Sequence, residues 1–385
     1  MKTRTAGMKT QRGFTLIELM TSVTIMVVCI GFIAQVLIKQ SQASSSQSLQ
    51  RDLEESGRLA LLEIARNVRL AGYGITPVAA FDFDRYACTA PGTATTCNGG
   101  TGRRDRVDGP DELVLSYRDP NFSRVISSVT SSQVNFATPL KVAIPANSVI
   151  ELVASGGKVT YLLVSSAAAV GDTRIAYTTL PTTTPSAGYY TPSTTADASY
   201  VGANVTLVTR VRYFVANDTD GVPSLFKERG RGNELLYRGI EDVQYTFDIA
   251  QPPAGSSFAS TTPPAACAGT NSWTFGACTG TVGQPLETAT PPDWQNDSYD
   301  SANRYTAHPA NIRSVNITIV ARSTRASPDG AGDPLPALGN RPARAADKFK
   351  RTVLQMSEQP MNLLTRQFFQ PLVISGPADG NVGGG

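Results

Sequence analysis

The hydrophobic pattern of the chain is least interrupted near its start. Residues 14–38 form an apolar run of 25 residues in which Glu18 is the only charged side chain, and Lys39 follows directly. At about 1.5 Å per residue a helix of this length spans about 37 Å, enough to cross a hydrocarbon core of about 30 Å with some tilt. The pattern therefore predicts a membrane-spanning helix over residues 14–38.

Beyond this run the apolar positions become periodic. They recur at helical spacings while charged residues occupy the other faces, which predicts an amphipathic helical half over residues 39–71 that holds a sheet against its apolar stripe. Gly72 is a predicted helix C-cap, and Pro77 makes continuation unfavourable. The Ser/Gln-rich residues 39–50 are the weakest part of this helix. The apolar stripe consists of Leu49, Leu53, Leu61, Ile64 and Val68.

Downstream of the helix the pattern changes to short alternating runs rich in β-branched and aromatic residues, which predict strands. Long Thr/Pro/Ser/Gly tracts separate them, and we expect these tracts to be solvated loops or to contact a partner. The predicted strands cover residues 113–117, 149–153, 159–164, 205–215, 235–237, 243–249, 315–321 and 350–356, and the tracts cover residues 178–199, 251–298 and 326–344.

These patterns predict an α+β fold in which one long N-terminal helix packs against an antiparallel, β-rich head with long loops. The head is expected over residues 72–375, and the Gly-rich tail at 376–385 is expected to be disordered. With 385 residues, of which 41% are hydrophobic, the chain is large enough to bury a substantial core.

The charge of the chain is concentrated at one end. The sequence has 34 Lys and Arg residues and 31 Asp and Glu residues, a net charge of +3. Residues 1–13 alone carry four basic residues and no acidic one, so the remaining chain has a net charge of −1. Positive charge before the apolar run places the N-terminus in the cytoplasm and residues after Lys39 outside. A net charge this small on a chain of this length is not typical of a nucleic-acid-binding protein.

Glu18 is the unusual residue of the apolar run. A carboxylate inside a membrane helix costs on the order of 2.5–3.5 kcal/mol, and such residues usually have a function and a partner. A secretory signal peptide would share the basic start, but its apolar region is shorter and holds no carboxylate. A plain single-span anchor fits the length and leaves Glu18 unexplained, so we expect a cation to neutralise it.

Residues 13–19 read Gly-Phe-Thr-Leu-Ile-Glu-Leu, which resembles the processing site of type IV prepilins. The resemblance implies that residues 1–13 are a leader, that a prepilin peptidase cuts between Gly13 and Phe14, and that Phe14 becomes N-methylated. Glu18 would then pair with the cationic amine of a neighbouring subunit's first residue. An ion pair in low dielectric offsets its desolvation only when the partner is close, which agrees with this role.

A second resemblance is to the PilW-like minor pilins, at both ends of the chain. Residues 55–74 form an Arg-rich helix end that closes in Ala-Gly-Tyr-Gly. Residues 224–227 with 239–245, and residues 312–317 to 321–323, resemble that family's paired C-terminal strands. Residues 352–357 read Thr-Val-Leu-Gln-Met-Ser and depart from the family's final strand. The middle, residues 78–220, is not covered by the resemblance.

The five cysteines divide by compartment. Cys29 lies in the apolar run, and we expect it to be a small packing residue. The other four cysteines lie beyond the predicted membrane span, in a compartment where disulfides persist. Their spacing favours local pairing, Cys88 with Cys97 and Cys267 with Cys278, over the two cross-pairings. Neither pair has the spacing of a zinc site.

Other chemistry finds little support in the sequence. His308 is the single histidine and has no nucleophile motif beside it. Residues 217–221 begin like a calcium loop, but Arg229 stands where the bidentate Glu would be, so a β-turn is the better interpretation. We therefore expect no enzyme, no metal and no cofactor.

The sequence thus predicts a minor pilin, a structural or priming subunit of a type IV pilus in a low-copy tip complex. A pseudopilin of a type II secretion system and a pilus-borne adhesin head, with residues 88–97 and 267–278 as its surface, are the alternatives. The resemblance implies other major and minor pilins, the prepilin peptidase and an inner-membrane assembly platform as partners, with no nucleic acid. It implies a single-pass inner-membrane location before assembly and the pilus or cell surface afterwards.

Overall fold

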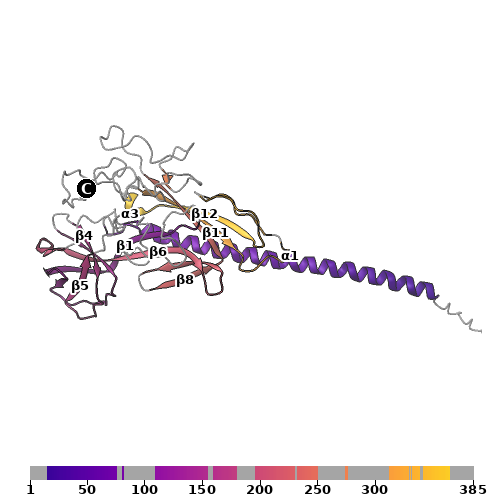
Figure 1. Cartoon of the computed structure of the whole chain (residues 1–385), viewed down its shortest axis with the longest axis horizontal. Helices are drawn as coiled ribbons and strands as arrows, with labels where there is room; N and C mark the ends of the chain where they lie inside the picture. The colour runs from indigo at the N-terminus through magenta and orange to yellow at the C-terminus, as the bar shows by residue number, and fades with distance from the viewer. Residues whose placement is uncertain are drawn as a thin grey trace, which may run out of the picture.

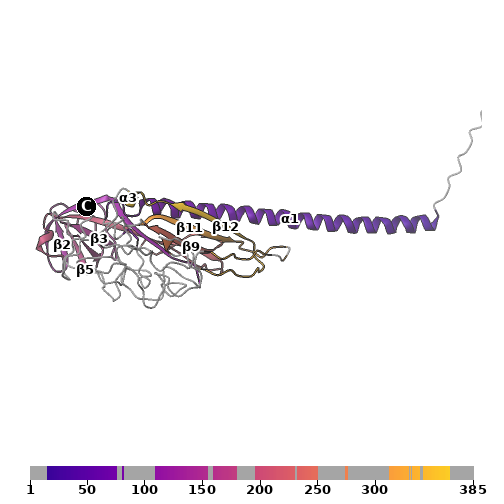
Figure 2. The same ribbon diagram turned by 90° about the horizontal axis from the view of Figure 1, so that it is seen from above.

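The molecule consists of one long helix and a β-rich head at one end of it (Figure 1). The computed structural model describes residues 15–75, 80–81, 109–154, 159–179, 196–229, 232–249, 274–275, 312–328, 330, 332–338 and 341–364. Helix α1, Leu16–Leu70, has 55 residues. Its first half projects from the head, and its second half lies along it (Figure 2). The predicted α+β fold class is confirmed.

Helix α1 is continuous through residues 39–50, the stretch expected to be its weakest. Thr15 is its N-cap and Ala71 its C-cap. Gly72 follows with a φ of +76°, a left-handed conformation that glycine adopts without the steric cost of a Cβ. The helix therefore ends beside the glycine that the sequence indicated.

Twelve strands and two short helical elements make up the described part of the head. All eight predicted strands are present, and most extend beyond the predicted bounds. The strands are β1 Leu113–Val129, β2 Gln133–Phe136, β3 Val149–Val153, β4 Val159–Val164, β5 Arg174–Thr179, β6 Asn204–Asn217, β7 Pro223–Glu228, β8 Asn233–Arg238, β9 Ile240–Ile249, β10 Thr274–Phe275, β11 Ile312–Arg322 and β12 Arg351–Glu358, with the 3₁₀ helix η2 Ala198–Tyr200 and helix α3 Met361–Leu364.

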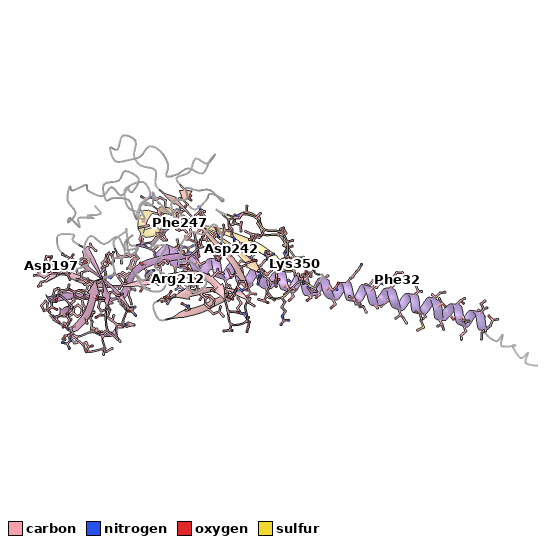
Figure 3. The ribbon with its side chains drawn as sticks, viewed as in Figure 1. Phe32, Asp197, Arg212, Asp242, Phe247 and Lys350 are labelled. Atoms are coloured by element: carbon pink, nitrogen blue, oxygen red, sulfur yellow. The ribbon has the colours of Figure 1, made fainter. Side chains whose placement is uncertain are left out.

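The end of the head farthest from the free helix is a closed antiparallel barrel, here called the distal barrel. Its strands follow the order β1-β2-β5-β4-β3-β6, and a second pairing between β1 and β6 closes the ring. Its core has its own set of buried side chains, among them Phe122, Phe136, Leu152 and Leu162. Asp197, at the N-cap of η2, lies at this end (Figure 3).

The second half of α1 packs between two sheets. The first is formed by the other ends of β1 and β6 together with β7 and β8, and the second has the order β10-β9-β11-β12. Side chains of both sheets join the helix in one core, including Ile64 and Val68 of the helix, Leu115 of β1 and Ile317 of β11. A Cβ at Gly57 would collide with Leu354 of β12, so this glycine lets the helix approach the strand closely.

The C-terminal strands pair regularly despite the unusual composition of residues 352–357. β9 pairs with β11 with Tyr245 opposite Ile317, and β11 pairs with β12 with Ile319 opposite Leu354. Each of these strands directs alternate side chains toward α1. β12 thus takes the place of the final strand of the sheet although its sequence departs from the family's pattern.

The segment between β11 and β12, residues 323–350, is packed against the sheet and is here called the strap. Leu335 and Leu338 pack with Val320 and Val353. Arg341 forms a buried ion pair with Asp242 of β9. Residues 326–344 were expected to be a solvated loop or to contact a partner. Most of the described residues of this tract are exposed, but Leu335, Leu338 and Arg341 are buried against the outer face of the second sheet, which the sequence did not predict.

A tight turn joins β6 to β7, as predicted. The Oδ1 atom of Asp218 accepts hydrogen bonds from the backbone N–H groups of Asp220 and Val222, each at 2.9 Å, and Gly221 has a φ of +75°. Arg238 forms ion pairs with both aspartates, at 2.7 and 2.6 Å. These carboxylates are thus turn residues held by an arginine.

Candidate assembly site

The free half of α1 carries the first part of the candidate site. Its apolar side chains are exposed all round the helix; Leu16 is 79% exposed and Ile25 is 64% exposed. An 18-residue window of the helix reaches a mean hydropathy of 2.3, and none of that window is buried in the protein. In the described part of the chain this is the one helix that is long and apolar enough to cross a membrane. Phe32 lies on this projecting half (Figure 3).

The hydroxyl groups of this half are satisfied within the helix. Ser22 donates to the carbonyl oxygen of Glu18 at 2.6 Å, and Thr24 donates to that of Met20 at 2.8 Å. In lipid every polar group needs such an internal partner, because no water is present to replace it. These hydroxyl groups therefore do not oppose insertion of the helix into a bilayer.

Glu18 lies at the first turn of α1 and forms a capping box with Thr15. Its Oε2 atom accepts hydrogen bonds from the Thr15 N–H at 3.1 Å and from the Thr15 hydroxyl at 3.0 Å. The Glu18 N–H in turn donates to the Thr15 hydroxyl at 3.3 Å. A carboxylate near a helix N-terminus is favoured by the helix dipole, and a capping box satisfies two otherwise unpaired donors. The fold thus fixes Glu18 as a carboxylate acceptor on an otherwise apolar surface.

The predicted cleavage residues, Gly13 and Phe14, lie outside the described residues, as do Cys88, Cys97, Cys267 and Cys278 and also His308. The two disulfide pairings and the cleavage therefore stay predictions. Cys29 is a free thiol on the exposed surface of α1. Across the described ranges no group of three or more His, Cys, Asp or Glu residues is placed to hold a metal ion.

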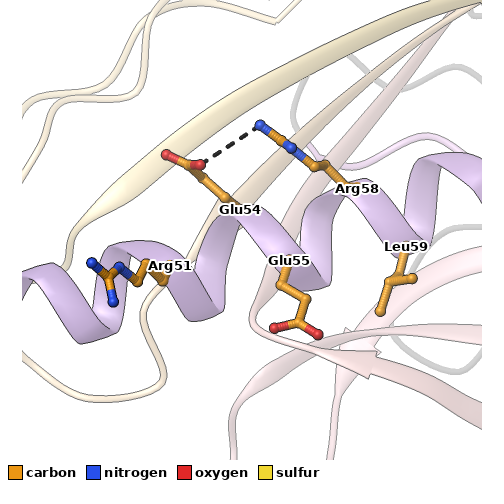
Figure 4. Close-up of a pocket in the computed structure, with 5 residues that line it drawn as sticks. All are labelled: Arg51, Glu54, Glu55, Arg58 and Leu59. Carbon is orange, nitrogen blue, oxygen red and sulfur yellow. Dashed lines mark ion pairs between the residues drawn. The ribbon is translucent and has the colours of Figure 1, made fainter.

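The second part of the site is the exposed face of the amphipathic half. A shallow hollow here is lined by side chains of one helix face, and Glu54 and Arg58 form an ion pair across it at 3.8 Å (Figure 4). Both side chains are well exposed, so the pair contributes little to stability. The hollow has no buried polar group that would fix a small ligand. Its lining residues are Arg51, Glu54, Glu55, Arg58 and Leu59.

A buried polar cluster joins the opposite face of the helix to the first sheet. It consists of Glu63 and Asn67 of α1, Tyr213 of β6 and Lys227 of β7. Charged residues of this half of the helix were expected on the faces away from the apolar stripe, so the sequence did not predict this cluster. The available signal was that Asn67 lies between Ile64 and Val68, next to the apolar stripe and one turn after Glu63.

Residues 8–34 match a family model described as the prokaryotic N-terminal methylation motif. The matched segment contains Glu18, the capping residue Thr15 and the exposed apolar half of α1. The protein is type IV pilin-like or pseudopilin-like. No curated protein and no solved structure matches the chain.

Three general conclusions follow from this pilin-like assignment taken together with the fold. The apolar half of α1 is a single-pass membrane anchor of the type that prepilins share. The partners are of pilin type, and a prepilin peptidase is the processing enzyme that the motif indicates. The head carried by this anchor is β-rich and antiparallel, as described above.

Proposed function

We propose that the protein is a minor pilin, a non-enzymatic structural or priming subunit of a type IV pilus. The observation that carries the proposal is the exposed apolar half of α1, which begins with the capped carboxylate of Glu18. Inside a filament such a surface would be covered by the apolar helices of neighbouring subunits. Glu18 would face the cationic, methylated amine of a neighbour's Phe14.

The size and shape of the head favour a low-copy position at the tip. The distal barrel extends the head along its long axis, at the end opposite the free helix (Figure 1). A bulky head is easier to place once at a tip or priming complex than at every position along a shaft. The precursor would sit in the inner membrane with its N-terminus in the cytoplasm, where the assembly platform would pass it to other major and minor pilins and on to the cell surface.

The decisive test of this proposal substitutes Glu18 in the full-length precursor. We expect Glu18→Ala to insert into the membrane and to be processed, yet to be lost from sheared filaments, because the carboxylate that pairs with the neighbour's amine is gone. Asp52→Ala is the matched control, since it removes an exposed carboxylate from the same helix at a position that does not line the hollow. Incorporation is measured by immunoblot of the filament fraction.

Three outcomes would contradict separate parts of the proposal. Incorporation of Glu18→Ala at the wild-type level would show that the pairing role is wrong. A mature N-terminus other than methylated Phe14, determined by mass spectrometry, would remove the basis for a pilin. The wild-type protein in a secretion complex, with none in pili, would favour a type II secretion pseudopilin, which would share the same leader and helix.

A further inference from the structure

The polar cluster between α1 and the first sheet holds an amine, a carboxamide and a carboxylate in one buried place. Lys227 is 3% exposed and Asn67 is 4% exposed, and Tyr213 is fully buried beside them. Such groups are rarely buried unless each has a partner, because burial removes their hydrogen bonds to water. Glu63 is the partner they share, and it retains some contact with solvent.

The contacts converge on one oxygen atom. The Lys227 Nζ atom donates a hydrogen bond to Glu63 Oε1, and the Asn67 Nδ2 atom donates to the same Oε1 at 3.3 Å. The Tyr213 hydroxyl group also donates to this oxygen at 3.3 Å, and it accepts a hydrogen bond from Asn67 Nδ2 at 2.7 Å. Glu63 Oε1 is thus an acceptor that the amine and the carboxamide share, and Asn67 Nδ2 also donates to the backbone carbonyl oxygen of Glu63 at 3.0 Å.

These three groups are the components of an amide-forming reaction. A lysine amine is a nucleophile when it is neutral, a carboxamide carbon is an electrophile, and a carboxylate placed between them can carry a proton from one to the other. The burial of Lys227 and Asn67 limits the access of water that would compete as a nucleophile.

We propose that Lys227 and Asn67 form an intramolecular amide bond, with Glu63 as the proton carrier. The Glu63 carboxylate takes a proton from the Lys227 ammonium group, and the neutral Nζ attacks the Asn67 Cγ atom. The new Cγ–Nζ bond forms as the Cγ–Nδ2 bond breaks. Glu63 delivers this proton to the departing Nδ2, which leaves as ammonia. Glu63 then takes up the second proton, which Nζ loses as it becomes an amide nitrogen, and releases it to the solvent that it still contacts. No oxidant or other co-reactant is needed.

The surrounding groups suit these roles. Burial opposes ionisation of Glu63, but the hydrogen bond and the charge of Lys227 outweigh it and lower the pKa of this carboxyl group, so Glu63 begins as the carboxylate that accepts the first proton. Burial and the nearby Glu63 raise the pKa of Tyr213 well above its usual value. Tyr213 therefore stays protonated and keeps Asn67 Nδ2 in place.

The bond would fasten the helix to the head covalently. Asn67 lies in the last turns of α1, and Lys227 lies in the hairpin strand β7, far away in the sequence. If the protein is a filament subunit, as proposed above, tension on the filament acts on α1 and reaches the head through this contact. The covalent link itself does not depend on that function, and its test is independent of filament assembly.

Mass spectrometry of the full-length protein in detergent tests the link directly. After reduction and alkylation of the cysteines, we expect a chain lighter than its unlinked mass by one ammonia molecule. Trypsin should fail to cut after Lys227 and should release residues 67–69 joined to residues 213–229. Cleavage after Lys350, which forms an ion pair with Asp333 at 3.9 Å, is the control within the same digest.

A variant tests the role of the proton carrier. Glu63→Gln keeps the size of the side chain but cannot accept the proton, so we expect the unlinked mass and normal cleavage after Lys227. Unlinked wild-type protein would overturn the proposal. Loss of one water molecule instead of ammonia would overturn it too, because the bond would then be at Glu63. A link that persists in Glu63→Gln would refute the role of Glu63.

Discussion

The two halves of α1 have similar helical geometry and opposite surroundings. In the first half, Ile25 is 64% exposed, whereas in the second half Ile64 is fully buried between the two sheets. The first half is apolar on every face, and the second half is apolar along one stripe only. The comparison teaches that the spacing of apolar residues, more than their number, determines whether a helix is covered by its own head or by lipid and neighbouring helices.

The largest expected difference between the two halves is in how the free energy of unfolding responds when an isoleucine is replaced by alanine in each half. Ile64→Ala should lower the free energy of unfolding of the head by about 2–5 kcal/mol, because it leaves a cavity in the core. Ile25→Ala should leave that free energy unchanged. Chemical denaturation in detergent, monitored by far-UV circular dichroism, measures the free energy of unfolding of both variants. Equal effects of the two variants would show that the halves are not independent.

A smaller effect on the stability of the head is expected when the pH is lowered. The ion pairs concerned lie in the head and not in the membrane half of α1. The side chain of Arg351 is 4% exposed, and it forms ion pairs with Glu241 of β9 at 2.6 Å and with Asp347 of the strap at 2.6 Å. The hydrogen bond from Arg351 lowers the pKa of Asp347 to about 2. Burial opposes ionisation of Glu241, but Arg351 outweighs it and lowers the pKa of that carboxyl group as well.

Both carboxyl groups have lower pKa values in the folded protein than in the unfolded chain, so their contribution is present above the ordinary values of 4.5 and 3.8. It should be lost as the pH falls through the folded values, down to about 2 for Asp347. We expect the stability of the head to decline across this window and the decline to be shallower in Arg351→Met. The same slope in both proteins would show that these pairs do not cause it.

The smallest effect is expected on the solvent-exposed face of the amphipathic half. Arg58→Ala removes the ion pair with Glu54, whose two side chains are 70% and 41% exposed. Such a pair contributes about 0.3–0.5 kcal/mol, and salt screens it. Thermal unfolding at low and high salt should therefore differ little between Arg58→Ala and the wild type. A large loss would show that this face packs against something in the protein.

The features that could be predicted from the sequence are those with a local signal. The length and charge pattern of residues 14–38 indicate a membrane helix without reference to the rest of the chain, and residues 13–19 carry the prepilin motif in consecutive positions. Gly72 marks the end of α1 because a left-handed residue is needed there. Strands such as β3 and β4 have the β-branched composition that predicts them.

The features that were missed depend on contacts between distant residues. β2 and β5 are short and polar enough to lack a strand signal, yet their pairing with each other and with β1 and β4 closes the distal barrel. The strap has no hydrophobic period, and Leu335 and Leu338 are buried because of the sheet that they meet. The contact between Asn67 and Lys227 by way of Glu63 likewise joins positions that no local pattern relates.

Strand β6 has a consequence for how the head moves as a whole. It runs for 14 residues without interruption, pairing with β3 inside the distal barrel and with β7 beside α1. At about 3.3 Å per residue it is roughly 46 Å long, and bending it would break the hydrogen bonds of both ladders. The barrel and the sheet beside α1 therefore move as one rigid body, so that any turn of α1 about its own axis turns the distal barrel with it.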